Sequence, residues 1–186
     1  MNEFNTYEFV VHQRIEGKWL LARIGLILLY VSYVLGALLL GITTRIIAPL
    51  LALITISLWI IIFITWRYTD VEYEYSITSG ELTFSKIFGS RSRRRQLVIL
   101  LRDAVRIAPL DNGEYSALAE SWHPEREYTA VSSMSAPDIY YVLFEFKGAD
   151  KKEKRRAIFY FEATARALQI CRFYNPSGTV MTKTSR

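Results

Sequence analysis

Residues 24–66 read IGLILLYVSYVLGALLLGITTRIIAPLLALITISLWIIIFITW. The stretch contains 21 uncharged, mostly apolar residues (24–44), one charged residue, Arg45, and then 21 more uncharged residues (46–66). At about 1.5 Å per residue, each half forms a helix of roughly 31 Å, which is close to the thickness of a bilayer's hydrocarbon core. The sequence therefore predicts two membrane-spanning helices joined by a turn.

The position of Arg45 favours two helices over one. A single continuous helix would place this charge in the middle of the bilayer, at a cost of at least ~2.5–3.5 kcal/mol. A turn at residues 41–45 leaves the charge in water, and Pro49 then lies in the first turn of the second helix, where its missing N–H is tolerated. The span lengths argue against a buried helix of a soluble core, and the second span argues against a cleaved signal peptide.

Basic residues near the spans predict their orientation. They lie before the first span and after the second, whereas the turn contains only Arg45; they are Arg14, Lys18, Arg23, Arg67, Lys86, Arg91, Arg93, Arg94 and Arg95. The positive-inside rule then predicts a two-span protein of the cell membrane with both termini in the cytoplasm. Neither span contains an ionisable residue, which disfavours a transporter and favours an anchor.

Small residues predict how the two spans pack. Ser32 and Gly36 are four residues apart in the first span, and Ala48 and Ala52 have the same spacing in the second. Counted from a turn near Thr44, Gly36 lies level with Ala52. Small residues that face one another allow close backbone approach, so we expect these four to form the helix–helix contact.

Length and charge limit the nature of the chain beyond the spans. The chain has 186 residues and a net charge of +5, but from Asp70 onward 18 Lys and Arg face 15 Asp and Glu, a net charge of +3. Nucleic acid is therefore not an expected partner. The single cysteine, Cys171, excludes an intramolecular disulfide and is expected to be a buried apolar residue. We predict an interfacial segment (1–18), the two spans (19–68), one cytoplasmic domain (69–180) and a flexible tail (181–186).

The first 18 residues mix aromatic and charged side chains. Phe4, Tyr7, Phe9 and Ile15 alternate irregularly with charges, which is typical of an amphipathic helix lying in the membrane interface. A short strand over residues 7–11 is the alternative.

After the second span the apolar period changes from that of a helix to that of a strand. Val71, Tyr73, Tyr75 and Ile77 alternate with polar residues, and the turn Ser79-Gly80 leads into a second strand, which predicts a β-hairpin. Further strands are expected near 95–101 and 104–108, a short helix and strand near 114–121 and 127–132, a second hairpin at 139–146 and 156–161, and a helix at 163–174 that ends before Asn175-Pro176.

This order of elements predicts the fold class. A membrane-spanning helical hairpin is followed by a mainly-β domain whose strands form hairpins and whose last element is a helix. That is the plan of a pleckstrin-homology-like (PH-like) domain, a curved antiparallel β-barrel capped by a C-terminal α-helix. A ferredoxin-like or simple α+β sandwich is the alternative, but it needs a second long helix after the spans, and the sequence offers none.

Three stretches carry a family resemblance. DVEYEYSITSGEL (70–82), the basic loop after it and VRIAPL (105–110) resemble a family of small bacterial membrane proteins with two N-terminal membrane helices and a PH-like domain of unknown function. FEAT (161–164) and the following helix are similar to the closing helix of such domains. The resemblance covers nearly the whole chain except residues 114–138. It implies a fold and an architecture, and it supplies no catalytic residues.

No pattern in the sequence indicates catalysis. Paired carboxylates, zinc-ligand spacings, nucleophile–base sets and glycine-rich phosphate loops are all missing, so we expect neither an enzyme nor a cofactor or metal. His12 and His123 are isolated in the sequence. A small hydrolase or transferase is a third hypothesis, and it would require His123, Glu125 and Asp138 to converge in the fold.

Two basic clusters are the candidate contact sites. The first cluster lies between the expected second and third strands and consists of Lys86, Arg91, Arg93, Arg94 and Arg95. The second cluster lies in the last hairpin, where Lys147 also lies, and consists of Lys151, Lys152, Lys154, Arg155 and Arg156. Each Lys or Arg near an anionic membrane surface contributes about 1 kcal/mol of binding. Alternatively, the charges keep sheet edges solvated and unpaired.

The sequence thus favours a non-enzymatic, membrane-anchored interaction module. Its cytoplasmic domain is expected to bind an unidentified protein partner, anionic lipid head groups, or both. The alternative hypothesis is a subunit of an oligomeric membrane complex, such as a homo-oligomer, that assembles through its transmembrane hairpin.

Overall fold

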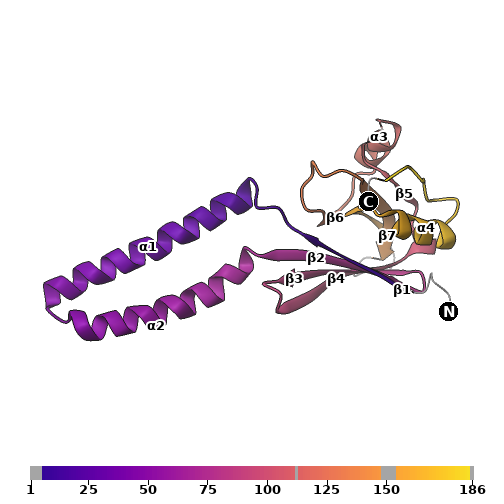
Figure 1. The fold of residues 1–186 in the computed structure, drawn as a ribbon. Coiled ribbons are helices and arrows are strands. Elements are labelled where there is room, and N and C mark those ends of the chain that lie inside the picture. Colours follow the sequence, from indigo (N-terminus) through magenta and orange to yellow (C-terminus); the bar gives the residue numbers. More distant parts are fainter. Residues whose placement is uncertain (1–5, 112, 148–153, 185–186) are drawn as a thin grey trace. The chain divides into compact units, whose positions relative to one another are not determined.

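The computed structural model describes residues 6–111, 113–147 and 154–184 (Figure 1). Contacts divide the chain into two compact units. One unit contains residues 14–71 and 88–92, and the other contains the described parts of 1–13, 72–87 and 93–186. Lys151 and Lys152 of the second basic cluster lie outside the described residues.

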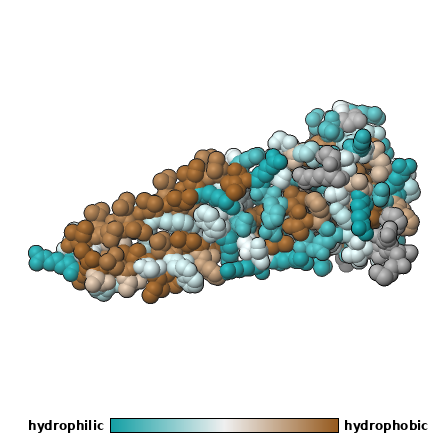
Figure 2. Space-filling model, viewed as in Figure 1, coloured by the Kyte–Doolittle hydropathy of each residue, from teal (hydrophilic) through white to brown (hydrophobic). Residues whose placement is uncertain are grey.

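Two long helices form the helical hairpin, as predicted. They are α1 (Lys18–Thr44) and α2 (Ile47–Thr65), and the left-handed backbone of Arg45 (φ 57°) reverses the chain between them. Apolar residues cover both helices (Figure 2). Both are long and apolar enough to cross a membrane. In the most apolar 18-residue stretch of each helix, only 11% (α1) and 6% (α2) of the stretch is buried, unlike in the helices of a soluble core.

Hydroxyl groups and one glycine form the contact between the two helices. Tyr30 bonds to Thr65, and the hydroxyl of Tyr33 lies 2.7 Å from that of Ser57. Gly41 packs tightly against α2, because an added Cβ would lie 2.9 Å from Leu50 Cδ2 and 3.5 Å from the Cα of Ile47.

The predicted small-residue contact is wrong. Ser32, Gly36, Ala48 and Ala52 are all exposed, and a Cβ added at Gly36 would meet nothing within 4 Å. The reason is helical phase: Ser32 is two residues from the buried Tyr30, which places it about 160° away around the helix. The tyrosine hydroxyls, which need partners in an apolar setting, occupy the contact face.

The first sheet has four strands in the order β1-β2-β3-β4. These are β1 (Thr6–His12), β2 (Val71–Thr78), β3 (Glu81–Phe88) and β4 (Ser92–Leu100). The chain turns with positive φ at Ser79-Gly80 and at Gly89-Ser90, as two-residue hairpin loops require. The predicted hairpin at residues 71–88 is confirmed. The next strand begins at Ser92, three residues earlier than expected, so Arg93 and Arg94 lie on β4 together with Arg95 and not in a loop.

Strand β1 corrects the prediction for the N-terminal segment. It pairs antiparallel with β2 over its whole length, from Thr6 opposite Thr78 to His12 opposite Glu72. Over residues 6–12 the structure has a strand in place of the interfacial helix predicted within residues 1–18, and the strand alternative is confirmed. Tyr7, Phe9 and Val11 alternate along one face, as a half-buried strand requires. The helical hairpin is thus inserted between the first two strands of the sheet, and the domain does not begin at residue 69.

The second sheet has the order β5-β7-β8-β6. It contains β5 (Arg106–Pro109), β6 (Arg126–Ala130), β7 (Ile139–Lys147) and β8 (Lys154–Glu162), with β6 parallel to β8. Helix α3 (Gly113–Ser121) covers the outer face, where Ala119 packs near Tyr141, Leu143 and Ile158. Burial on both faces explains why β7 is apolar almost without alternation.

Aromatic side chains fill the space between the two sheets. Phe84 of β3 lies 5.1 Å from Phe159 of β8, and Tyr75 of β2 lies 5.6 Å from Phe161. The Tyr75 hydroxyl also donates a hydrogen bond to the backbone carbonyl of Glu162. The two sheets are open and do not form the predicted curved antiparallel β-barrel, although the PH-like domain and the C-terminal helix are confirmed.

Helix α4 (Ala165–Tyr174) is the predicted C-terminal helix. It buries Ala167, Leu168, Ile170 and Cys171, which confirms the expectation for the cysteine. The buried Asn175 that follows it donates hydrogen bonds to the carbonyls of Leu101 (2.9 Å) and Ala104 (2.7 Å). The C-terminal end of the helix is thereby joined to the connection between the two sheets.

Candidate functional site

The turn between β3 and β4 belongs to the same compact unit as the helical hairpin. The backbone N–H of Gly89 in this turn donates to the carbonyl of Asp70 at 2.8 Å. Gly89 has φ 56°, and a Cβ added there would lie 2.7 Å from the Cβ of Arg67. Only glycine therefore permits the turn to pack against the residues that follow α2.

Two arginines lie on aromatic rings at this point. The guanidinium of Arg91 lies 4.3 Å from the centre of the Phe63 ring, and that of Arg67 lies 4.8 Å from the Tyr68 ring. Arg67 also donates to the Tyr68 hydroxyl at 2.8 Å. Cation–π contacts hold both arginines in place and leave N–H donors for an anion.

Between these arginines is a hollow of about 240 Å³ that we call the arginine hollow. Its lining residues are Ile62, Phe63, Trp66, Arg67, Asp70, Gly89 and Arg91. The α2 residues supply an apolar wall, and Arg67 and Arg91 supply two positive charges. Such a combination fits an anion attached to an apolar tail.

Arg23 of α1 does not line the hollow, but it contacts residues that lie in or next to it. It donates to the carbonyl of Thr69 at 3.1 Å, lies 3.9 Å from the carboxylate of Asp70, and lies 5.3 Å from the Trp66 ring. Because Asp70 is engaged by Arg23, its negative charge is partly neutralised, which leaves the hollow with a positive balance.

The first predicted cluster is divided by the fold. Arg91 lines the arginine hollow, whereas Lys86, Arg93, Arg94 and Arg95 belong to the other compact unit. Lys86 is half-buried, 5.6 Å from the Tyr73 ring, and burial lowers the pKa of its ammonium group. Arg93 forms ion pairs with Glu74 and Glu8.

Glu74 shows how buried the Arg93 ion pair is. Its side chain is buried, and burial raises the pKa of this carboxyl although Arg93 opposes the shift. Arg94 and Arg95 are exposed. Lipid contact by the whole first cluster stays a prediction, and the geometry supports it only for Arg91.

The described members of the second cluster have partners within the domain. Lys154 lies 3.0 Å from Glu145, Arg155 lies 3.4 Å from Glu125, and the Arg156 guanidinium lies 4.8 Å from the Trp122 ring. These exposed pairs leave less charge for a lipid surface than the sequence suggests. Lipid contact by this cluster also stays a prediction.

The three residues of the hydrolase hypothesis lie at different places. The backbone N–H of Glu125 bonds to Arg156 at the start of β8, whereas the carbonyl of Asp138 accepts from Ala163 just after its end. A strand of that length separates the two by about 20 Å. His123 is exposed. Within the part of the chain that the structure describes, no group of three His, Cys, Asp or Glu residues could hold a metal ion.

Sequence reasoning missed most of the arginine hollow. Arg67 entered only the prediction of orientation, and Phe63 and Gly89 were not singled out. A usable signal was present: Gly89-Ser90 is a two-residue turn followed at once by an arginine, and Arg67 follows directly on an apolar span.

Two packed sheets with a C-terminal helix at the edge define the chain as a PH-like domain carrying two apolar helices. The chain belongs to the bacterial PH-like domain family DUF6106, a family of unknown function, whose model matches residues 4–181. The match includes β1 and the helical hairpin, and the family resemblance noted in the sequence is confirmed. No curated protein and no solved structure matches the chain.

Proposed function

We propose that this protein is a non-enzymatic, membrane-anchored interaction module whose arginine hollow binds anionic phospholipid head groups. The observation that carries the proposal is the pairing of Arg67 and Arg91 with the apolar wall of α2 in one hollow. PH-like domains are generally non-catalytic, which agrees with a binding role. The module presents its domain at the cytoplasmic face, where it meets a protein partner.

The fold supports a membrane topology with both termini on one side. Strands β1 and β2 pair with each other, and the helical hairpin is the segment between them. Paired strands lie on the same side of a bilayer, so the chain crosses an even number of times between them. Basic residues at the β1/β2 end of the hairpin, against Arg45 alone at the turn, favour the cytoplasm for that side.

The arginine hollow suits a phosphate at the membrane surface. A guanidinium can donate two parallel hydrogen bonds to a phosphate, and two guanidinium groups more than balance the single negative charge of a phosphodiester. Trp66 and Tyr68 follow α2 directly, at the level where amphipathic rings prefer the bilayer interface. Ile62 and Phe63 then lie where the acyl chains of a bound lipid begin.

The test is lipid retention by the full-length protein. We would purify the protein in mild detergent, add phosphatidylglycerol or phosphatidylcholine, and count bound lipids by native mass spectrometry. The variant Arg67→Gln/Arg91→Gln should bind phosphatidylglycerol roughly thirty-fold more weakly, because each of the two arginines contributes about 1 kcal/mol and about 1.4 kcal/mol is tenfold in affinity. Arg172→Gln, an exposed arginine of α4, is the matched control and should bind like the parent.

Equal retention of the two lipids by the parent protein would reject the head-group site, as would equal binding by the double variant. The same spectra give the mass of the complex. A discrete multimer would support the alternative hypothesis of an oligomeric membrane subunit.

A further inference from the structure

Strand β4 is the last strand of the first sheet. Within the described residues its sheet partner is β3 alone, so one edge of β4 carries backbone N–H and C=O groups without a strand partner. The side-chain amide of Gln96 donates to the carbonyl of Arg94 at 3.3 Å, which partly substitutes for a missing neighbour. Such an edge is a template for pairing with another extended chain.

The far half of β7 presents a second free edge. Strand β5 pairs with β7 only as far as Leu143, opposite Arg106. Beyond that point residues 144–147 pair with β8 on one side, and in the part of the chain that the structure describes no strand pairs with their other side. The two sheets therefore leave an opening between β4 and the end of β7.

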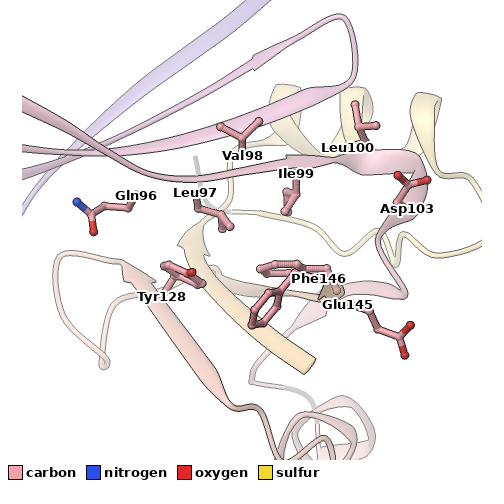
Figure 3. Close-up of a pocket in the computed structure, with 10 residues that line it drawn as sticks. Gln96, Leu97, Val98, Ile99, Leu100, Asp103, Tyr128, Glu145 and Phe146 are labelled. Atoms are coloured by element: carbon pink, nitrogen blue, oxygen red, sulfur yellow. The ribbon is translucent and has the colours of Figure 1, made fainter. Parts of the chain in front are cut away.

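A groove of about 410 Å³ occupies this opening (Figure 3). Leu97 and Ile99 point from β4 toward Tyr128 of β6 and Phe146 of β7, whereas Val98 and Leu100 point away from them. Phe144 is also part of the lining, and its ring lies 6.4 Å from that of Tyr128. The floor of the groove is thus apolar and aromatic.

Positive charge borders the β4–β7 groove. Arg95 is exposed on the face of β4 that carries Leu97 and Ile99, Arg94 is exposed on the opposite face of the same strand, and the Arg126 guanidinium lies 5.1 Å from the Phe146 ring. The acidic residues of the lining are already engaged, since Asp103 lies 3.7 Å from Arg102 and Glu145 lies 3.0 Å from Lys154. The unbalanced charge is therefore positive and is concentrated on the first half of β4.

We propose that the β4–β7 groove binds an extended segment of another protein that adds to β4 as an antiparallel strand. Because β4 is basic in its first half and apolar in its second, an antiparallel segment must be apolar first and acidic afterwards. The inference rests on the proposed function, since it names the chemistry of the partner that the interaction module would bind.

Charge and backbone pairing favour this occupant over others. A second copy of the chain pairing through β4 would bring the same arginines to the groove and no carboxylates. Lipid tails cannot satisfy the backbone groups of a strand edge. An acidic, apolar strand satisfies both the hydrogen bonds and the charge.

The experiment uses the full-length protein in lipid nanodiscs and a synthetic nine-residue probe. The probe has alternating valine and threonine in its first five positions and glutamate in its last four. We expect saturable binding by fluorescence anisotropy, and slower hydrogen–deuterium exchange in residues 92–100. Arg94→Glu/Arg95→Glu should weaken binding roughly ten-fold, because two favourable charge contacts become repulsive.

Controls keep strand addition apart from general charge effects. A probe with lysine in place of glutamate should bind the double variant better than the parent protein, and Arg172→Glu should bind like the parent. Unchanged thermal stability checks that the double variant is folded. Phosphatidylglycerol retention should not change, which separates this groove from the arginine hollow.

Three results would overturn the proposal. The first is that the probe shows no saturable binding up to about 1 mM. The second is that the probe binds without slowing hydrogen–deuterium exchange in residues 92–100. The third is that exchange in those residues slows with protein concentration alone, whether or not the probe is present. The last result would assign β4 to an interface between two copies of the chain. If the protein failed to retain lipid but still bound the probe, the proposed lipid site would be rejected and the proposal for the β4–β7 groove would still hold.

Discussion

The helical hairpin and the PH-like domain bury their apolar residues to very different extents. Along α1 and α2 only Tyr30, Gly41 and Ile54 are buried, whereas the ten residues of α4 alone contain four that are buried. The domain builds its own apolar interior from facing sheets. The hairpin exposes leucine and isoleucine outward and joins its helices through hydroxyl pairs. Because burial differs so much between them, the hairpin and the domain should respond differently to the same kind of substitution.

The largest difference is expected from truncating an apolar side chain. Phe159 is fully buried, 5.1 Å from Phe84 and 5.7 Å from Phe161, so Phe159→Ala should lower the free energy of unfolding of the domain by about 3–5 kcal/mol. Leu28→Ala in α1 removes a side chain that is already 63% exposed. Thermal denaturation in detergent should show a large shift for the first variant and little for the second. Similar shifts would contradict the difference between the two parts.

A pH titration should also separate the two parts. Burial raises the pKa of the Cys171 thiol to about 12, whereas in the unfolded chain it is ~8.5. Because the unfolded state then loses its proton first, this contribution to stability is complete below pH ~8.5 and declines as pH rises toward 12. The loss approaches about 1.4 kcal/mol per pH unit.

Denaturation of the domain between pH 8 and pH 10.5 measures the effect of the thiol. Cys171→Ala should flatten the curve below pH ~10, above which Tyr141, whose pKa burial raises to about 12, continues to contribute. The helicity of the hairpin should not change over this range. If the stability of the parent domain did not change between pH 8 and pH 10.5, the role of the thiol would be contradicted.

The smallest effect is expected inside the hairpin. Tyr30→Phe removes the hydrogen bond to Thr65, and such bonds between membrane helices contribute about 0.6 kcal/mol on average. Unfolding of the hairpin in mixed detergent micelles should show a loss of that size. Gly41→Leu is the second variant. Its side chain would collide with Leu50, so it should lower the stability of the hairpin more than Tyr30→Phe does. A Tyr30→Phe loss as large as that of Phe159→Ala would show that the two parts are stabilised alike.

The elements that follow local patterns could be predicted from the sequence. The uninterrupted spans, the alternation over residues 71–77 and the helix before Asn175-Pro176 each have a strong local signal, and all three are confirmed. The order of these elements predicted the PH-like plan, and the family match agrees with it. Local patterns do not say which edges of two sheets meet, so the open sheets were not foreseen.

The remaining errors have a common physical cause, which is pairing over long distances in the sequence. Strand β1 is defined by pairing with β2, whose register joins His12 to Glu72 across the whole hairpin. The partners of the second basic cluster include Glu125, which is distant in sequence from Arg155. The helix contact was misassigned because residue size alone was considered, whereas Tyr30 and Tyr33 need hydroxyl partners.

The insertion of the hairpin between β1 and β2 sets an order of events during synthesis. The ribosome makes β1 first, and 58 residues (13–70) separate it from the strand it pairs with. At 5–20 residues per second, β1 waits about 3–12 s for that partner. Under the proposed topology, a chain in which only one helix crossed the membrane would leave β1 and β2 on opposite sides, and the first sheet would lack its β1 edge. With that topology, β1 can therefore join the first sheet only in chains whose two helices have both crossed the membrane.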